Sequence, residues 1–211
     1  SPEGFIKYGD DYYICDTGNN KIVKFEDSGK SDFVVLTSPI DISLMNNSTD
    51  GDHFFVTCAN HTIFKVFLDR TKHIISGEEG VNGLANGLDR RVSVSVVNTT
   101  SSNSKYDSPT KIISDNDLNI LIIDQNNNAI RKHGLNSFDS TTEVGSHYIT
   151  QDNGTIKQYL NTSETLIDFI SDLGVLNKIE VKDDYLYIIQ KTTNSLKRIN
   201  KFTNELELIE D

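Results

Sequence analysis

One pattern occurs five times in this chain and constrains its fold more than any other feature. Each copy is a run of β-branched and aromatic residues, then a turn rich in Asn, Asp and Gly, then a run that alternates apolar and polar residues. The two clearest copies, residues 12–22 and 120–130, align without a gap, and the others span residues 54–63, 148–156 and 186–196. Two such runs joined by such a turn predict a β-hairpin in each copy.

The spacing of the copies predicts the architecture. The first apolar residues after the turns are 41, 67, 26 and 40 residues apart, a mean of 43.5; these residues are Ile22, Ile63, Ile130, Ile156 and Leu196. Repeats of about 40–45 residues with four short strands are typical of propeller blades. We therefore expect an all-β propeller in a single domain over residues 1–211, with blades near 2–38, 39–78, 107–145, 146–174 and 177–211.

The three prolines fit the same register, because Pro2, Pro39 and Pro109 precede the first apolar residues of their hairpins by 20, 24 and 21 residues. Proline has no backbone N–H and is tolerated at the first residue of a strand. Each proline is therefore expected to begin the first strand of a blade, and the last blade is expected to begin near Asn177 without one. The best helical candidate is residues 163–173.

The charge and the cysteines bear on partners and compartment. A formal charge of −11 argues against a nucleic-acid partner, which usually binds a basic surface. The apolar runs are far too short for a membrane span. Cys15 and Cys58 are one position out of phase in the repeat, so two free, structural thiols are expected. Six Asn-x-Ser/Thr triplets would suit a secreted protein, but an Asn-rich chain generates about four by chance, so a secreted and a cytoplasmic location both stay open.

Two of the repeats resemble the NHL repeat. The segment Tyr13–Lys24 contains the Asp-Thr-Gly-Asn-Asn turn and the basic strand that follows it, and residues 124–132 are similar. The resemblance implies an NHL-type β-propeller, a fold used by protein-interaction scaffolds, by some RNA-binding regulators and by a few metal-dependent enzymes. Such propellers commonly have six blades, whereas five repeats are present here, so the ring has five blades or one blade lies outside this chain.

Two sets of polar residues recur in the repeat, and each set has a possible functional role and a possible structural role. Asp16 and Asp124 occupy matching positions, where a cation-binding ring or an Asx turn is conceivable; the turn is favoured because the other copies carry Cys58, Gln151 and Gln190. Basic residues recur in the third strands and are expected to form an outward polar face; they are Lys24, Lys65, Arg131, Lys132, Lys157, Lys197 and Arg198. No spacing typical of catalytic residues, of a metal site or of a cofactor site is present.

The remaining candidate is a long excursion from Ser76 to Lys105, which the blade boundaries place at residues 79–106, hereafter the insertion. Long loops on a rigid propeller are frequent recognition elements. The expected partner-binding residues are Glu78, Glu79, Asn82, Asn86, Arg90 and Arg91. We therefore expect a non-enzymatic scaffold that binds a protein partner through its loops. The alternative is a metal-dependent hydrolase or lyase with ligands from several blades.

Overall fold

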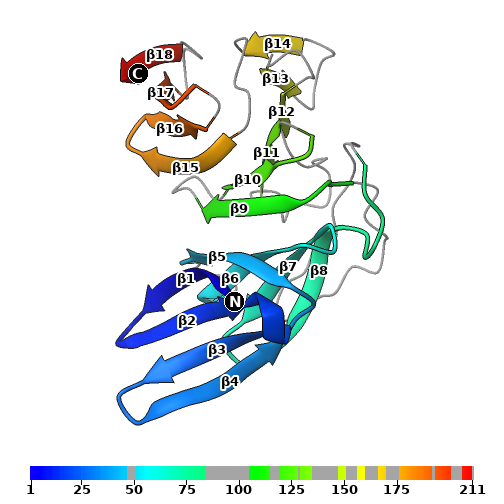
Figure 1. Ribbon diagram of the computed structural model, residues 1–211, viewed down its shortest axis with the longest axis vertical. Coiled ribbons are helices and arrows are strands. Elements are labelled where there is room, and N and C mark those ends of the chain that lie inside the picture. The colour runs from blue at the N-terminus through cyan, green and yellow to red at the C-terminus, as the bar shows by residue number, and fades with distance from the viewer. Residues whose placement is uncertain are drawn as a thin grey trace. The chain divides into compact units, whose positions relative to one another are not determined.

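The computed structural model describes residues 1–46, 51–83, 105–114, 119–127, 129–134, 147–150, 156–159, 166–169, 176–191, 193–200 and 206–210. Within these ranges the regular elements are β-strands and one turn of 3₁₀-helix, η1 (Thr17–Asn19) (Figure 1). No helix of the described residues is long and apolar enough to span a membrane.

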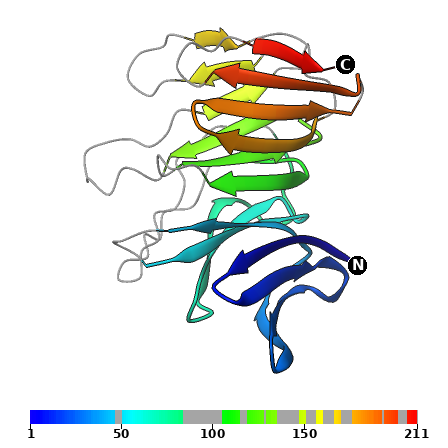
Figure 2. The ribbon, with the colours of Figure 1, turned by 90° about the vertical axis from the view of Figure 1, so that its left-hand side faces the viewer.

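The strands lie in chain order within five sheets. The first sheet contains β1 (Pro2–Tyr8), β2 (Asp11–Asp16), β3 (Lys21–Glu26) and β4 (Gly29–Val35), whose order can be followed in Figure 2. The second contains β5 (Pro39–Met45), β6 (His53–Cys58), β7 (Thr62–Phe67) and β8 (Lys72–Gly77). The third contains β9 (Pro109–Ser114), β10 (Asn119–Asp124) and β11 (Ala129–Gly134), and the fourth contains β12 (His147–Thr150), β13 (Ile156–Tyr159) and β14 (Leu166–Phe169). The fifth contains β15 (Leu176–Lys182), β16 (Tyr185–Gln190), β17 (Ser195–Asn200) and β18 (Leu206–Glu210).

The chain divides into two compact units, Ser1–Ser114 and Asp115–Asp211. The first unit contains the first and second sheets and β9, and the second unit contains the strands from β10 onward.

The predicted repeat is confirmed in both units. Each copy of the pattern forms an antiparallel hairpin, namely β2–β3, β6–β7, β10–β11, β12–β13 and β16–β17. Strands β1, β5 and β9 begin at Pro2, Pro39 and Pro109, as expected from the missing backbone N–H of proline. The fifth sheet begins at Leu176, one residue before the predicted Asn177.

The helix predicted over residues 163–173 is wrong, because Leu166–Phe169 forms strand β14 and pairs with β13. An isolated helix of this length is marginal in water, whereas the edge of β13 offers backbone donors and acceptors to a strand. Tertiary pairing therefore decides the conformation of this segment.

The core of the first unit lies between its first two sheets. Tyr13, Cys15 and Ile22 of the first sheet pack with Phe54 and Val56 of the second. The ring centroids of Tyr13 and Phe54 are 4.7 Å apart. At the edge of this core, the Tyr8 hydroxyl donates a 2.9 Å hydrogen bond to Asp52, which raises the pKa of Tyr8. Burial of each large apolar side chain stabilises this contact by about 1.5–3 kcal/mol.

The last residue of the second strand plays the same part in three hairpins, β2–β3, β10–β11 and β16–β17. The Asn19 amide donates to the Asp16 carboxylate at 2.8 Å, the Asn127 amide donates to Asp124 at 2.9 Å, and the Thr193 hydroxyl donates to Gln190 at 3.2 Å. The donor is thus the side chain three residues on. The expected Asx turn is wrong for Asp16, because its side chain does not cap the backbone of η1. Gln151 lies outside the described residues.

The expectation that the third strands present an outward basic face is wrong at two positions. Arg131 and Asp124 are both fully buried, and the Arg131 guanidinium donates to the Asp124 carboxylate at 3.0 Å. Arg131 pairs with Ile122, two residues before Asp124, and therefore lies on the same sheet face as that carboxylate. Lys65 is also buried, with its Nζ 4.9 Å from the ring centroid of Phe67.

Other members of the basic set are paired with carboxylates at the surface. Lys24 contacts Asp11 and Glu26 at 2.8 Å each, and Arg198 contacts Glu207 at 2.6 Å. Side chains of Lys132 and Lys157 lie outside the described residues. The third strands therefore do not carry a continuous basic track over the described positions.

Both cysteines are buried and free, as the phase difference in the repeat predicts. Burial raises the pKa of the Cys15 thiol. Burial also raises the pKa of the Cys58 thiol to about 12, although a hydrogen bond with Thr62 acts in the opposite direction. Both side chains therefore carry protonated thiols at neutral pH.

We predict that breaking the buried ion pair is far more costly than breaking an exposed one. Asp124→Asn leaves the Arg131 charge buried and is expected to lower the free energy of unfolding by about 3–5 kcal/mol. The matched control, Glu207→Gln, removes the exposed partner of Arg198 and should cost about 0–1 kcal/mol. Urea unfolding of the two variants measures the difference, and equal losses would contradict a structural role for the buried pair.

A second prediction concerns the thiols. Native protein at pH 8 should resist iodoacetamide at both cysteines, whereas urea-unfolded protein should react at both, as mass spectrometry can count. The unfolded Cys58 thiol ionises near pH 9 and the folded one at about 12, so the folded state holds more protons between these values. The free energy of unfolding should therefore fall as pH rises above about 9, and rapid alkylation of the native state would contradict the burial.

Candidate partner-binding site at the insertion

The insertion occupies the link between two sheets. The corresponding link between the first and second sheets is short, because β4 ends at Val35 and β5 begins at Pro39. The link from β8 to β9 instead runs from residue 78 to residue 108. The structure describes residues 78–83 and 105–108 of this link, which contain the two ends of the insertion and are called its legs. Both legs belong to the first unit.

Each link ends in the same way, with a Ser-Pro pair held by the preceding hairpin turn. The Ser38 N–H donates to the Asn20 side chain at 2.8 Å, and the Ser108 N–H donates to Nδ1 of His61 at 3.2 Å. Both serines have positive φ, as do the two turn residues that hold them. The insertion therefore lengthens the link without changing the contact that starts the next sheet.

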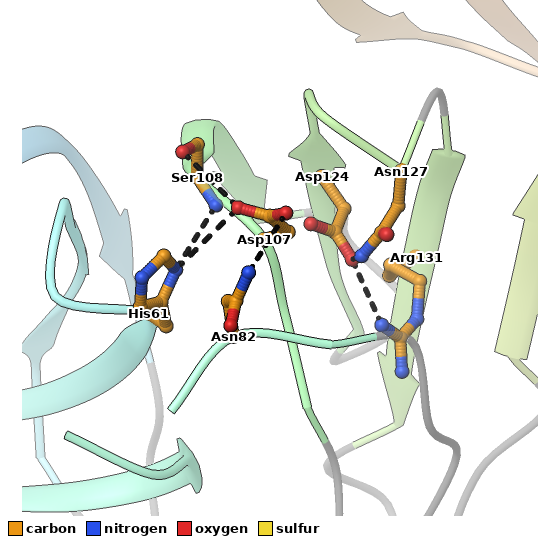
Figure 3. A network of polar contacts seen from close by, with 7 residues as sticks. All are labelled: His61, Asn82, Asp107, Ser108, Asp124, Asn127 and Arg131. Atoms are coloured by element: carbon orange, nitrogen blue, oxygen red, sulfur yellow. Dashed lines mark hydrogen bonds and ion pairs between the residues drawn. The ribbon is translucent and has the colours of Figure 1, made fainter. Parts of the chain in front are cut away.

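His61 is the centre of a small polar cluster at the second leg (Figure 3). Its Nδ1 lies 3.8 Å from the Asp107 carboxylate, whose other oxygen accepts a 3.3 Å hydrogen bond from the Asn82 amide. The Ser108 hydroxyl donates to Asp107 at 3.5 Å. Asn82 belongs to the first leg, so Asp107 joins the two legs to each other, while the Ser108 N–H joins the second leg to the β6–β7 turn.

This cluster contains Ser, His and Asp but lacks the geometry of a catalytic triad. In a triad the histidine accepts the serine hydroxyl proton, while the carboxylate accepts from the other ring nitrogen. Here Nδ1 of His61 accepts from the Ser108 backbone, and the Ser108 hydroxyl turns to Asp107. The arrangement can hold two chain segments together but does not activate the hydroxyl.

The first leg is fixed by Glu79. Its carboxylate accepts hydrogen bonds from the Asn60 side-chain amide at 3.1 Å and from the Thr37 hydroxyl at 3.4 Å. The Thr62 hydroxyl donates to the side-chain oxygen Oδ1 of Asn60 at 2.6 Å and so orients this amide. The backbone N–H of Gly80 also donates to the Asn60 carbonyl at 3.0 Å. This leg is therefore anchored on two turns of the first unit.

The backbones of the two legs also pair directly. Asn82 and Tyr106 form a parallel bridge, and the Gly83 N–H donates to the Tyr106 carbonyl at 3.0 Å. The buried Tyr106 ring extends back to the second sheet, where its hydroxyl accepts from Ser76 at 2.9 Å. Gly77 turns the chain into the first leg with a φ of +81°, and a Cβ there would lie 2.1 Å from the His61 carbonyl oxygen. Only glycine fits this position.

The predicted partner-binding residues divide into three groups. Glu78 is exposed at the start of the first leg, Glu79 and Asn82 are used in its anchoring, and Asn86, Arg90 and Arg91 lie outside the described residues. The anchoring roles of His61, Asp107 and Ser108 were not predicted from the sequence. The recurrence of Ser-Pro at the start of β5 and β9 was the available signal.

Among the described residues, no group of three or more His, Cys, Asp or Glu side chains is arranged to hold a metal ion. The described part of the site consists of the two anchored legs, the exposed carboxylates of Glu78 and Glu79, and the polar cluster around His61 in Figure 3.

We predict that His61 controls the order of both legs. His61→Gly removes the imidazole while tolerating the positive φ, and should raise amide exchange at Asn82, Gly83 and Asp107 about tenfold with little change in β6 and β7. Asn194→Gly is the matched control, since Asn194 is the equivalent left-handed turn residue of the fifth sheet. Unchanged exchange in the His61 variant, or the same increase in the control, would contradict this role.

Comparisons with known proteins identify the fold. No model of a protein family matches the chain, and no curated protein is significantly similar to it in sequence. In structure it is similar to a chain of a nidogen/laminin complex, with a TM-score of 0.50 and 12% identity, covering 100% of this chain and 80% of that one. It is also similar to a selenomethionine-substituted virginiamycin B lyase from Staphylococcus aureus, with a TM-score of 0.56 and 14% identity, covering 99% of this chain and 69% of that one. At these identities the likeness shows the fold alone: the chain has the all-β fold of a β-propeller, built from antiparallel sheets of which three have four strands over the described residues.

Proposed function

We propose that this protein is a non-enzymatic β-propeller scaffold that binds a protein partner through the insertion. The observation that carries the proposal is the double anchoring of the insertion base by Glu79 on one leg and by Asp107 and His61 on the other. A binding loop that is already ordered at its base loses less conformational entropy on association.

Several specific contacts hold the base of the insertion in place. A plain link of three residues suffices between β4 and β5, so the fold does not require the longer path between β8 and β9. The longer link ends in the same Ser-Pro contact as the short one. A scaffold can therefore present a long loop there without disturbing the start of the next sheet. One of the structural neighbours comes from a complex of two proteins, which is consistent with this use of the fold.

Two finer assignments belong to the same proposal. The repeats are of the NHL type, on the strength of the Asp-Thr-Gly-Asn-Asn turn at residues 16–20 and its counterpart at residues 124–128. The chain forms one functional domain over residues 1–211, with the insertion at 79–106 as its recognition element.

The test is site-specific photo-crosslinking. A photo-reactive amino acid replaces the exposed Glu78 in one variant and the exposed Asp27, in the distant β3–β4 turn, in a matched control. In extract from the source organism, the Glu78 variant should give a discrete higher-mass adduct that is absent from the Asp27 variant.

The His61→Gly variant, combined with the same photo-reactive residue at Glu78, adds a second arm. Loss of order at the base should weaken the adduct several-fold, because the ordering cost then falls on binding. Equal adducts at Glu78 and Asp27, or no adduct at Glu78, would overturn binding through the insertion.

A further inference from the structure

The first leg of the insertion contains a dipeptide that can modify itself, because Asn82 is followed directly by Gly83. In an Asn-Gly pair the glycine nitrogen can attack the side-chain carbonyl carbon of the asparagine. Glycine has no side chain to obstruct this approach, and its backbone adopts many conformations. The pair is therefore a candidate for deamidation, which converts the neutral side-chain amide into a carboxylate.

This reaction needs only water as a co-reactant. The Gly83 nitrogen loses its proton to hydroxide and bonds to Cγ of Asn82, while the bond from Cγ to Nδ2 breaks and Nδ2 takes up a proton from water and leaves as ammonia. Water then opens the cyclic imide that has formed. Opening on one side gives aspartate, and opening on the other gives isoaspartate, in which the main chain runs through Cγ. No group is oxidised or reduced.

In the structure both reacting groups are engaged in contacts with the second leg. The Gly83 N–H donates to the Tyr106 carbonyl at 3.0 Å, and the Asn82 side-chain amide donates to the Asp107 carboxylate at 3.3 Å (Figure 3). The backbones of Asn82 and Tyr106 are also paired in a parallel bridge. The attack requires the glycine N–H to give up both its acceptor and its proton. The reaction therefore proceeds from a state in which the legs have separated.

The same separation controls hydrogen exchange of the Gly83 amide, because exchange also requires this N–H to lose its acceptor. His61 opposes the separation, since its Nδ1 accepts from the Ser108 N–H at 3.2 Å and lies 3.8 Å from the Asp107 carboxylate. Deamidation of Asn82 and amide exchange of Gly83 should therefore respond together to any change at His61.

The product of the reaction no longer supports the pairing of the legs. A carboxylate at position 82 has no N–H to donate, and it faces the carboxylate of Asp107, which is also negative and only an acceptor. Like charges opposite each other on paired strands are destabilising. Isoaspartate in addition lengthens the main chain between the bridged residue 82 and Gly83, which displaces the Gly83 N–H from the Tyr106 carbonyl.

From these observations we infer that Asn82 is a deamidation site, that the pairing of the two legs protects it, and that its deamidation weakens this pairing and loosens the base of the insertion. The change is not reversed, because the ammonia is lost to solvent. It needs neither an enzyme nor a bound partner. It is therefore independent of the proposed function, and either can fail without the other.

The first test follows deamidation of Asn82 in the full chain by peptide mass spectrometry, with fragment ions to assign the modified residue. In chain unfolded by guanidinium chloride, Asn82 and Asn86 should react at equal rates, because each is followed by Gly-Leu. Asn86 thus reports the intrinsic chemistry. In the native chain Asn82 should react about tenfold more slowly than in the unfolded chain, by a factor similar to the protection of the Gly83 amide against exchange.

The second test changes the pairing of the legs without changing the dipeptide. In the native His61→Gly variant, deamidation of Asn82 should rise about tenfold, together with the amide exchange of Gly83. Asn194→Gly, the equivalent change in the turn of the fifth sheet, is the matched control and should leave both rates unchanged.

The third test measures the effect of the product. Asn82→Ala removes the donor to Asp107 without adding charge, and should raise the exchange of the Gly83 amide about fivefold. Asn82→Asp removes the same donor and adds a carboxylate, so its exchange should be faster still. The comparison separates the new charge from the lost hydrogen bond.

Four outcomes would overturn the inference. Equal deamidation of Asn82 in native and unfolded chain would show that the paired legs give no protection. An Asn82 that does not react even in the unfolded chain would show that the dipeptide is not a modification site. Faster Gly83 exchange without faster deamidation in the His61→Gly variant would place the protection elsewhere. Equal exchange in the Asn82→Asp and Asn82→Ala variants would show that the new carboxylate does not weaken the pairing.

Discussion

The packing of one sheet face on the next is the interaction on which the described structure depends. Phe54 and Val56 of the second sheet are fully buried against Tyr13, Cys15 and Ile22 of the first. Backbone hydrogen bonds hold each sheet together, but a four-stranded sheet alone leaves both of its faces in water. Its stability therefore comes from the neighbouring sheet. The same requirement explains why the buried positions recur at fixed places in the repeat.

Polar side chains that fix the ends of strands complete this packing. Three of the second strands end in Asp16, Asp124 and Gln190, and each of these accepts a hydrogen bond from a side chain three residues on. Asp124 does more, because it also neutralises a fully buried Arg131. A buried charge without such a partner would be strongly destabilising. The Asp124 carboxylate therefore binds both Asn127 in the turn and Arg131 in the third strand of that hairpin.

Much of the fold could be predicted from the sequence because the repeat is regular. Hairpin positions, the strand starts at Pro2, Pro39 and Pro109, and the free state of the cysteines all follow from the period of the pattern and from the alternation of strand residues. The helix expected at residues 163–173 was wrong because pairing with β13, which is a tertiary effect, overrides a weak local preference. The prediction that Arg131 faces outward is wrong, because the recurrence of a basic residue in the repeat does not indicate which face of the strand that residue occupies. The anchoring cluster of His61, Asn82 and Asp107 joins residues up to 46 positions apart, a proximity that no local pattern encodes.

The insertion shows how a repeat protein can gain a new element at little structural cost. The contact that starts each new sheet is a serine N–H held by a left-handed turn residue, Asn20 in one case and His61 in the other. Since this contact is local to the last residue of the link, the length of chain before it is free to vary; closing a longer loop costs entropy that grows only slowly with length. That cost is reduced further where the legs are joined, as they are by the pairing of Asn82 with Tyr106 and Asp107. The sheets can therefore keep their register while the link between them is extended.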